Sequence, residues 1–396
     1  MAYSVGMRDR EQIGTPRWLL WLALRVFWGA ISAIVFRPQV TGRETLPTDG
    51  PYLLLANHTS TFDTLWVSAP LGRPAHFMTS AALFRNPIAG WVLPLVGAFP
   101  KEVGKKDRTS AATLQALYEG GAIIQIMPEG ARTWDGRLQP VGTGLGRLVK
   151  RLNARVVVCR VDTGHWCWPR WATWPRWVPL HLHFHPPQTW DSGASDAHIR
   201  DAIVAQMTPV APHHLGRSLC FRPAEGLPTF LYACPECGSR PTRAERDTLC
   251  CDGCQRRWLV GADMTLRPTD APQTTLPLAH AYDAMRQHFG APMVDTRTGD
   301  RERGIALRAP CTVLHLRRGQ PDTVLADGPL TLSESGLRAD DWHLPFSDIR
   351  SIHMDAGNVL NLRIAEGLVR VAPEDGQTYL WENAIRSWWE GTESGD

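Results

Sequence analysis

The chain has 396 residues, more than one ordinary hydrophobic core holds, so about two or three domains are expected. Hydrophobic residues make up 43% and charged residues 20%, which excludes an intrinsically disordered chain. The formal net charge is only +3, so charge alone gives no argument for a nucleic-acid partner. The N-terminal residues mix both signs of charge, and no small-residue cleavage site follows a clean apolar core. This pattern argues against a secreted precursor.

The first predicted element is a helix over residues 18–36, which are apolar apart from Arg25 and Ser32. Such a helix would be about 28 Å long, close to the roughly 30 Å of a bilayer core. However, a charge near the middle of a spanning helix costs about 2.5–3.5 kcal/mol. Arg25, Gly29 and Ser32 recur at helical spacing, so we interpret residues 1–40 as a monotopic membrane helix that turns this stripe toward protein or headgroups. A buried core helix and a true membrane span are the alternatives.

The next informative stretch is the apolar run Leu53–Leu55, which predicts a buried strand that ends at Asn57 and His58. Asp63 follows His58 five residues later. The turn after a rigid strand can expose a side chain, and a histidine oriented by a carboxylate is suited to general base catalysis. Taken alone, the pair fits a structural histidine equally well.

A second apolar run over residues 122–127 predicts another buried strand, which leads into Pro128-Glu129-Gly130-Ala131-Arg132. Arginine offers a charged fork for a phosphate group, and glycine lets a ligand approach the backbone closely. This strand end therefore indicates a site for an anionic ligand.

Together, Asn57-His58-x-Ser60-x-x-Asp63 and Pro128-Glu129-Gly130-x-Arg132 resemble the two signature blocks of the glycerolipid acyltransferases, a family that includes 1-acylglycerol-3-phosphate acyltransferase. Asp135-Gly136-Arg137-Leu138 is also similar to that family. The resemblance covers roughly residues 15–210 and implies an α/β domain, a sheet flanked by helices, over residues 41–215. It implies that His58 and Asp63 are catalytic. It also implies a set of substrate-binding residues: Asn57, Ser60, Lys101, Glu129, Gly130 and Arg132.

The sequence departs from the family pattern at some of these positions. Lys101 lies nearest to the place of an arginine that binds the acceptor's phosphate, and Arg108 is the second choice. A solvated basic loop over residues 105–108 is the alternative. Ala131 stands where the family usually has a threonine or serine hydroxyl, and the strand over residues 156–161 lacks the usual proline. We therefore expect weaker discrimination between acceptors.

Tryptophan is unusually frequent, with 17 residues, and several of them lie with Arg and Pro between residues 166 and 177. Tryptophan favours membrane interfaces, where its ring is apolar and its N–H stays wet. Interleaved Trp and Arg could also stack nucleic-acid bases. Beside an apolar helix and a lipid-handling motif, we interpret this segment as an interfacial belt.

Four of the nine cysteines form two C-x-x-C pairs, and this spacing favours metal binding in a reducing compartment over a disulfide framework. The pairs predict a zinc ribbon over residues 228–262, in which four thiolates close a tetrahedral shell and leave no position for catalysis. Cys250 competes with its neighbour, but only the neighbour keeps the two-residue gap. The predicted ligands are Cys234, Cys237, Cys251 and Cys254. We expect the zinc to stabilise a fragment too small to hold a core.

Residues 305–392 alternate apolar and polar positions with turn residues between them, and a final helix places Trp381, Ile385 and Trp388 on one face. Many short strands followed by one helix resemble a pleckstrin-homology-like domain. Such a domain could bind lipid headgroups or a protein, and the sequence leaves this choice open.

The expected function is transfer of an acyl group from acyl-CoA or acyl carrier protein to the hydroxyl of a lysophospholipid, above all 1-acylglycerol-3-phosphate. The expected location is the cytoplasmic side of the cell membrane, as a monotopic or peripheral protein in contact with membrane phospholipids. The chemistry needs no metal, and no nucleic acid is expected. The alternative is a non-catalytic membrane-bound adaptor that presents the zinc ribbon and the C-terminal domain to a partner.

Overall fold

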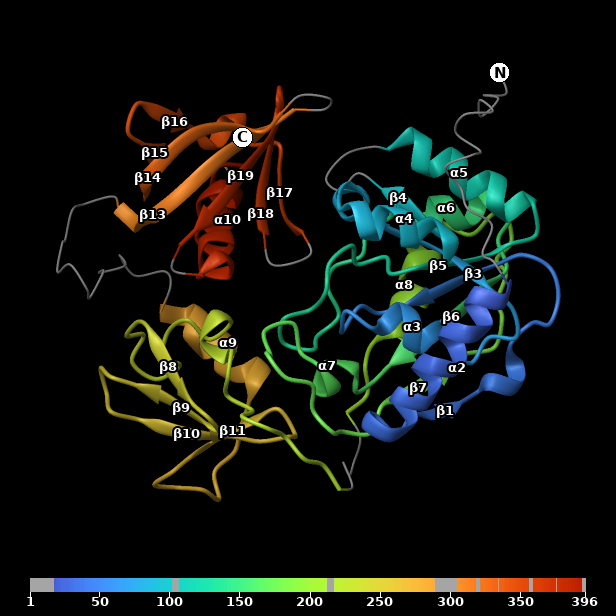
Figure 1. The fold of residues 1–396 in the computed structure, drawn as a ribbon, viewed down its shortest axis with the longest axis horizontal. Helices are drawn as coiled ribbons and strands as arrows, with labels where there is room; N and C mark the ends of the chain where they lie inside the picture. Colours follow the sequence, from blue (N-terminus) through green and yellow to red (C-terminus); the bar gives the residue numbers. More distant parts are fainter. Residues whose placement is uncertain are drawn as a thin grey trace. The chain divides into compact units, whose positions relative to one another are not determined.

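The computed structural model describes residues 18–101, 107–211, 217–288, 305–317, 321–333, 335–355, 359–374 and 376–393. Residues 1–17 of the expected membrane segment, and Lys105 and Lys106 of the basic loop, lie outside these ranges. The described residues form two compact units that divide between residues 221 and 222, with residues 171–173 counted in the second unit. The ribbon is drawn in Figure 1.

The first unit is built on a seven-stranded sheet with the strand order β1-β7-β6-β2-β5-β3-β4. β2 pairs in parallel with β5 and β6, and β3 pairs in parallel with β5 and β4. β7 runs antiparallel to β6. The carboxyl ends of β2 to β6 therefore meet at one edge of the sheet. The strands are β1 (Gln39–Thr41), β2 (Tyr52–Ala56), β3 (Ala75–Ser80), β4 (Ala98–Lys101), β5 (Ile123–Ile126), β6 (Val156–Val161) and β7 (His181–Phe184).

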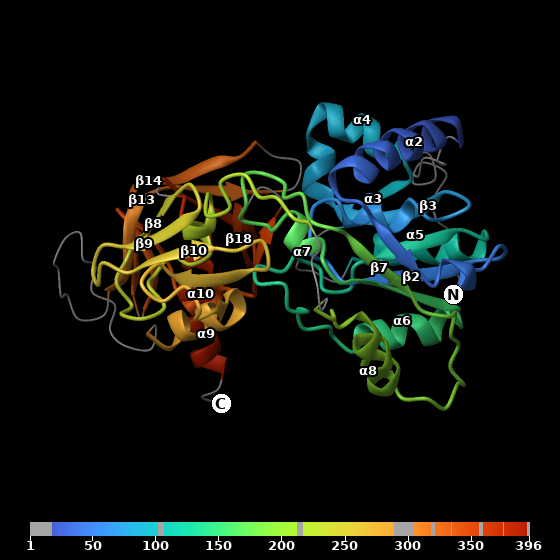
Figure 2. The ribbon, with the colours of Figure 1, turned by 90° about the horizontal axis from the view of Figure 1, so that it is seen from below.

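Helices cover both faces of this sheet. Figure 2 shows α2, α3 and α4 on one side and α6 and α8 on the other. The helices are α2 (Trp18–Val35), α3 (Asp63–Ser68), α4 (Pro87–Leu95), α5 (Arg108–Glu119), α6 (Gly144–Leu152), α7 (Gly164–Cys167) and α8 (Asp196–Met207), with 3₁₀ turns at Arg43–Thr45 and Ala81–Arg85.

β2 is the central strand, and all its side chains are buried, as expected for a parallel strand covered on both faces. Leu53 and Leu55 belong to a core cluster with Val149 of α6 and Ile203 of α8, while Leu54 points to the opposite face. Truncating one such leucine to alanine typically costs about 2–5 kcal/mol. The loop after β2 therefore starts from a rigid strand.

α2 turns its polar stripe toward the protein, as the sequence indicates. Arg25 Nε donates to the carbonyl oxygen of Ala69 at 2.8 Å, and Ser32 is buried. The opposite face is apolar and exposed, with Phe27 64% and Ile34 73% accessible. Within the part of the chain that the structure describes, α2 is the helix long and apolar enough to cross a membrane.

The second unit contains a five-stranded antiparallel sheet with the order β12-β11-β10-β9-β8, and one of the four predicted metal ligands, Cys251, ends β9. It has a core of its own, in which Trp258, Leu266 and Met285 are buried. This core extends beyond the predicted range 228–262, because β11, β12 and α9 follow it and α9 packs against β11 and β12. The elements are 3₁₀ turn η3 (Leu227–Thr229), β8 (Thr242–Glu245), β9 (Thr248–Cys251), β10 (Arg257–Val260), β11 (Thr265–Pro268), β12 (Leu276–Pro277) and α9 (Leu278–Gln287).

The rest of the second unit is a seven-stranded antiparallel sheet with the order β16-β15-β14-β13-β19-β18-β17, followed by α10. Trp381 and Ile385 of α10 are buried, as their helical spacing predicts. Tyr282 of α9 donates to Asn383 of α10 at 3.2 Å, which joins the two sheets of this unit. The elements are β13 (Ile305–Leu316), β14 (Thr323–Ser333), β15 (Gly336–Ala339), β16 (Trp342–Leu344), 3₁₀ turn η5 (Phe346–Asp348), β17 (Ser351–Asp355), β18 (Val359–Ile364), β19 (Gly367–Pro373) and α10 (Thr378–Glu393).

Candidate active site

The loop after β2 holds the predicted catalytic pair. His58 Nδ1 lies 2.9 Å from Asp63 Oδ2. The imidazole is partly exposed at 24%, whereas the carboxylate is fully buried. Because Asp63 occupies Nδ1, Nε2 is the ring nitrogen that can accept a proton from a substrate.

Asp63 is fixed by its own loop. Its Oδ2 accepts the backbone N–H of Thr59 at 2.5 Å and that of Ser60 at 2.8 Å, and its Oδ1 accepts the Thr59 hydroxyl at 2.9 Å. Asp63 is also the first residue of α3, where the helix dipole favours a negative charge. These contacts hold the carboxylate in one orientation, so the imidazole beside it is oriented before a substrate arrives.

Both polar atoms of the Asn57 side chain contact main chain, and its role in substrate binding stays a prediction. Its Nδ2 donates to the carbonyl oxygen of Val161 at 2.8 Å, and its Oδ1 accepts the Val161 N–H at 2.7 Å. The amide therefore ties the end of β2 to the end of β6. Ser60, also predicted to bind substrate, is fully buried and contributes its backbone N–H to Asp63.

Glu129 bridges two loops through its carboxylate oxygens. Oε1 accepts the backbone N–H of His58 at 2.5 Å, and Oε2 accepts that of Gln139 at 2.6 Å. Burial raises the pKa of Glu129 to about 8, against the lowering effect of these two hydrogen bonds. The sequence predicted a binding residue, but its oxygens are engaged by main chain, so we interpret Glu129 as a positioning residue for His58.

Arg132 brings a cation next to the same loop. Its Nη1 donates to the Thr61 hydroxyl at 2.7 Å, and the following N–H of Thr133 donates to the His58 carbonyl oxygen at 2.9 Å. Burial lowers the pKa of Arg132 from its ordinary value, but a guanidinium stays protonated in proteins. Gly130 is exposed with φ +73°, a left-handed conformation that favours glycine.

Lys101 lies at the same edge of the sheet as His58, but on a strand that is distant from it. It ends β4, and β3 and β5 stand between β4 and β2. At about 4.8 Å between neighbouring strands, β4 is roughly 14 Å from β2. Arg108, the second choice, begins α5 and is exposed. Either cation would therefore contact a part of the substrate remote from His58, and their binding role stays a prediction.

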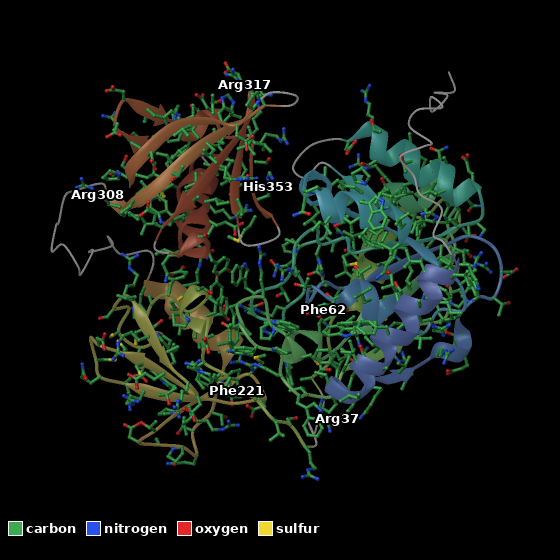
Figure 3. All side chains as sticks on the ribbon, in the orientation of Figure 1. Arg37, Phe62, Phe221, Arg308, Arg317 and His353 are labelled. Atoms are coloured by element: carbon green, nitrogen blue, oxygen red, sulfur yellow. The ribbon has the colours of Figure 1, made fainter. Side chains whose placement is uncertain are left out.

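The sequence did not identify the residues that pack behind the two loops. Phe62, labelled in Figure 3, stacks on Trp28 of α2 at a ring distance of 4.6 Å and contacts Trp168 at 5.0 Å. Trp171 is 4% exposed, whereas Trp174 is 46% exposed. The Trp-rich segment is therefore not a continuous exposed belt. Tryptophan clustering was the available signal, but spacing cannot show which rings fold inward.

The four predicted metal ligands come together in the second unit. Their sulfur atoms all lie within 4.8 Å of one another. The Cys234–Cys254 and Cys237–Cys251 sulfurs are 3.7 and 3.6 Å apart, and tetrahedral Zn–S bonds of about 2.3 Å place sulfurs about 3.8 Å apart. Cys250 is not part of this group. The donor set fits a closed tetrahedral metal site.

Residues 37–162 match the family model described as Acyltransferase. A chloroplastic 1-acyl-sn-glycerol-3-phosphate acyltransferase of Brassica napus is 29% identical over 134 residues, which are 33% of this chain and 39% of the relative. A 1-acyl-sn-glycerol-3-phosphate acyltransferase of Bacillus subtilis is 29% identical over 96 residues, 24% of this chain and 48% of the relative. The chain thus spans less than half the length of these relatives.

Among solved structures, the chain is similar to the 1-acyl-sn-glycerophosphate acyltransferase of Thermotoga maritima. The two are 17% identical and superpose with a TM-score of 0.41, over 47% of this chain and 76% of that one.

Proposed function

We propose that this chain is a glycerolipid O-acyltransferase that moves a fatty acyl group from acyl-CoA or acyl carrier protein to the hydroxyl of a lysophospholipid, above all 1-acylglycerol-3-phosphate. The observation that carries the proposal is the 2.9 Å contact between His58 Nδ1 and Asp63 Oδ2 at the edge of the sheet. The family match over residues 37–162, and the activity named for the relatives, support the same reaction class.

In this reaction, His58 Nε2 removes the proton of the acceptor hydroxyl while its oxygen attacks the thioester carbonyl carbon. A C–O bond forms, the C–S bond breaks, and the imidazolium returns the proton to the leaving thiolate. Asp63 keeps the Nδ1 proton in place and stabilises the imidazolium. Such proton transfer typically contributes about 10²–10⁴ in rate, so positioning of the substrates supplies much of the rest.

The acceptor's phosphate is proposed to bind the cation of Arg132, with Gly130 allowing close approach to the backbone. Lys101 would contact a more remote part of the lipid. Glu129 would act on the reaction only through the backbone N–H of His58. An acceptor bound at its anionic end thus presents its hydroxyl to Nε2.

The first unit is proposed to lie on the cytoplasmic side of the cell membrane, held by the apolar face of α2. α4 lies on the same side of the sheet as α2, and its Trp91 is 71% exposed. Replacing Phe27 with Asp should weaken cosedimentation with anionic phospholipid vesicles. Val210→Asp is the matched control, because Val210 is exposed at 53% on another segment. Equal binding of both variants would contradict this orientation.

In the second unit, Cys234, Cys237, Cys251 and Cys254 are proposed to hold a structural zinc ion as a zinc ribbon. Four thiolates complete the shell, so the metal would take no part in acyl transfer. The seven-stranded sheet with its C-terminal α10 supports the pleckstrin-homology-like interpretation of residues 305–392.

A thiol-release assay with acyl-CoA and lysophosphatidic acid tests the reaction. The purified wild-type protein should release CoA only when both substrates are present, and His58→Ala should abolish the release. His198→Ala is the control, because His198 is an exposed residue of α8. Equal activity of His58→Ala would refute the role of the imidazole. Absence of any wild-type activity with lysophospholipids would favour the adaptor alternative.

A further inference from the structure

We propose that Arg170 is a positioning residue of this site: it holds the peptide group between Arg132 and Thr133, one of the groups through which the Arg132 loop contacts the His58 loop. This inference rests on the proposed acyl transfer. It concerns a residue outside the segment 37–162 that the family model matches.

Arg170 lies behind the Arg132 loop, a few residues after α7. Its side chain is only 9% exposed. Its Nη1 donates to the carbonyl oxygen of Arg132 at 3.3 Å, and its guanidinium carbon lies 4.6 Å from the centre of the Trp134 ring. A cation over an aromatic face is attracted by the ring quadrupole, and arginine's planar group suits this stacking. Arg170 is therefore fixed by two neighbouring residues of one loop.

The carbonyl oxygen that accepts from Arg170 belongs to the same peptide group as the Thr133 N–H. That N–H donates to the carbonyl oxygen of His58 at 2.9 Å. Because the peptide group is planar and conjugated, a cation at its oxygen polarises it and strengthens its N–H as a donor. Through this peptide group, a change at Arg170 would alter the hydrogen bond that the Thr133 N–H donates to the His58 backbone.

Other residues of the same segment contact the same two loops. Gly164 packs so closely that a Cβ would lie 2.2 Å from the Thr59 hydroxyl and 3.3 Å from Asp63 Oδ1. His165 lies 2.9 Å from where a Cβ of Gly136 would stand. Residues 164–170 therefore pack against both the loop that follows β2 and the loop that follows β5.

A positioning role and a purely structural role of Arg170 predict different effects on kcat. Arg170 acts on the His58 backbone through the peptide group between Arg132 and Thr133, so its loss should misplace the imidazole. A displacement of about 1 Å at a reacting group can cost on the order of 10²-fold in rate. A residue that only stabilises the fold would change the amount of folded protein and leave kcat of the folded fraction unchanged.

Arg73→Gln is the matched control. The Arg73 guanidinium donates to the carbonyl oxygen of Gly121 at 3.2 Å and also to that of Gly50. Like Arg170, it joins loops through main-chain oxygens. These loops precede β5 and β2, so they lie at the opposite edge of the sheet from His58.

The test compares steady-state kinetics of the full chain and its variants in the thiol-release assay with acyl-CoA and lysophosphatidic acid. Arg170→Gln should lower kcat on the order of 10²-fold, Arg170→Lys should recover part of this loss, and Arg73→Gln should leave kcat unchanged. If the kcat of Arg170→Gln falls no further than that of Arg73→Gln, the proposal is overturned.

A measurement that does not depend on catalysis distinguishes failure of the positioning role of Arg170 from failure of the proposed acyl transfer. The NMR signal of the His58 ring, assigned with His58→Ala, should shift in Arg170→Gln and stay in place in Arg73→Gln. An unshifted signal in Arg170→Gln would overturn the positioning role even in an active enzyme. A shifted signal in a protein without acyltransferase activity would support the positioning role and reject the proposed reaction.

Discussion

The edge of the first sheet and the cysteine cluster of the second unit are both small polar sites, but they are held together differently. At the sheet edge, loops far apart in the sequence fix the main chain of His58, because the Glu129 carboxylate accepts its N–H and the Thr133 N–H donates to its carbonyl oxygen. The cysteine site takes its ligands from two short C-x-x-C segments, and their geometry fits a metal as the common partner. The first site is prearranged by protein hydrogen bonds, whereas the second is proposed to be completed by a metal ion.

This difference determines what each site loses when one component is removed. When many hydrogen bonds fix a site, the loss of one of them leaves the fold intact but misplaces the reacting groups. A site completed by a metal loses its geometry as a whole. Substitutions at the first site should therefore change rates, and removal of the metal should change stability.

Among the variants that preserve the hydrogen bonds of the site, Asp63→Asn should lower the rate most while leaving the fold intact. An asparagine oxygen in the place of Oδ2 keeps the contacts with the N–H groups of Thr59 and Ser60 and with His58, and its NH₂ can donate to the Thr59 hydroxyl. Only the negative charge that stabilises the imidazolium is lost. We expect kcat to fall within the range of about 10²–10⁴ that general base catalysis supplies.

The measurement is kcat in the thiol-release assay, with thermal unfolding as the control for folding. An Asn variant with wild-type kcat would show that the carboxylate's charge is not needed. A large loss of thermal stability would show that the carboxylate is structural instead.

Removal of the metal should lower the stability of the second unit by several kcal/mol. In zinc-finger peptides the apparent binding free energy is about 10–16 kcal/mol. We expect a smaller loss here, because the buried side chains of Trp258 and Met285 also contribute to the stability of this unit. Chelator titration with thermal unfolding measures the loss, and Cys254→Ser should reproduce it. Cys250→Ser is the matched control, because Cys250 lies outside the cluster. A purified protein without zinc and with four freely titrating thiols would contradict the site.

Much of the fold could be predicted where the pattern was local. The all-apolar strand before Asn57 and the helical stripe of Arg25 and Ser32 follow from burial on both faces and from helical periodicity. The extent of the core around the cysteines could not be predicted. It depends on Met285 and its helix, which meet the sheet only through tertiary packing.

The candidate site shows the same limit. Spacing alone brought Asp63 within reach of His58, because Asp63 is the fifth residue after it and lies at the start of a helix. Spacing could not show that Glu129 is engaged by two main-chain N–H groups, since that depends on how loops from different strands meet. Arg170 carried no motif at all, and its role follows only from the loops that it contacts.

Glu129 makes the prearranged site sensitive to pH. Its folded pKa is about 8, above the ordinary value of 4.5, because burial penalises the charge. Between about pH 5 and 8 the unfolded chain has lost this proton and the folded chain keeps it, so stability falls as pH rises, by at most about 1.4 kcal/mol per pH unit. Above pH 8 both states are ionised and the slope disappears.

Glu129→Gln should remove this slope, because glutamine does not titrate. Urea unfolding of both proteins across this pH range measures it. An identical slope in the variant would mean that Glu129 is not the titrating group.

The smallest expected effect concerns Ala131, which stands where the acyltransferase family usually has a hydroxyl. Ala131→Thr adds one donor beside the proposed phosphate site, and a hydrogen bond contributes about 0.5–1.5 kcal/mol net. Since the phosphate is bound equally in the ground and transition states, KM for lysophosphatidic acid should fall roughly two- to tenfold with kcat unchanged. Ala131→Val is the matched control, because valine has the shape of threonine without the hydroxyl. If valine lowers KM as much as threonine does, the gain comes from packing and the phosphate lies elsewhere.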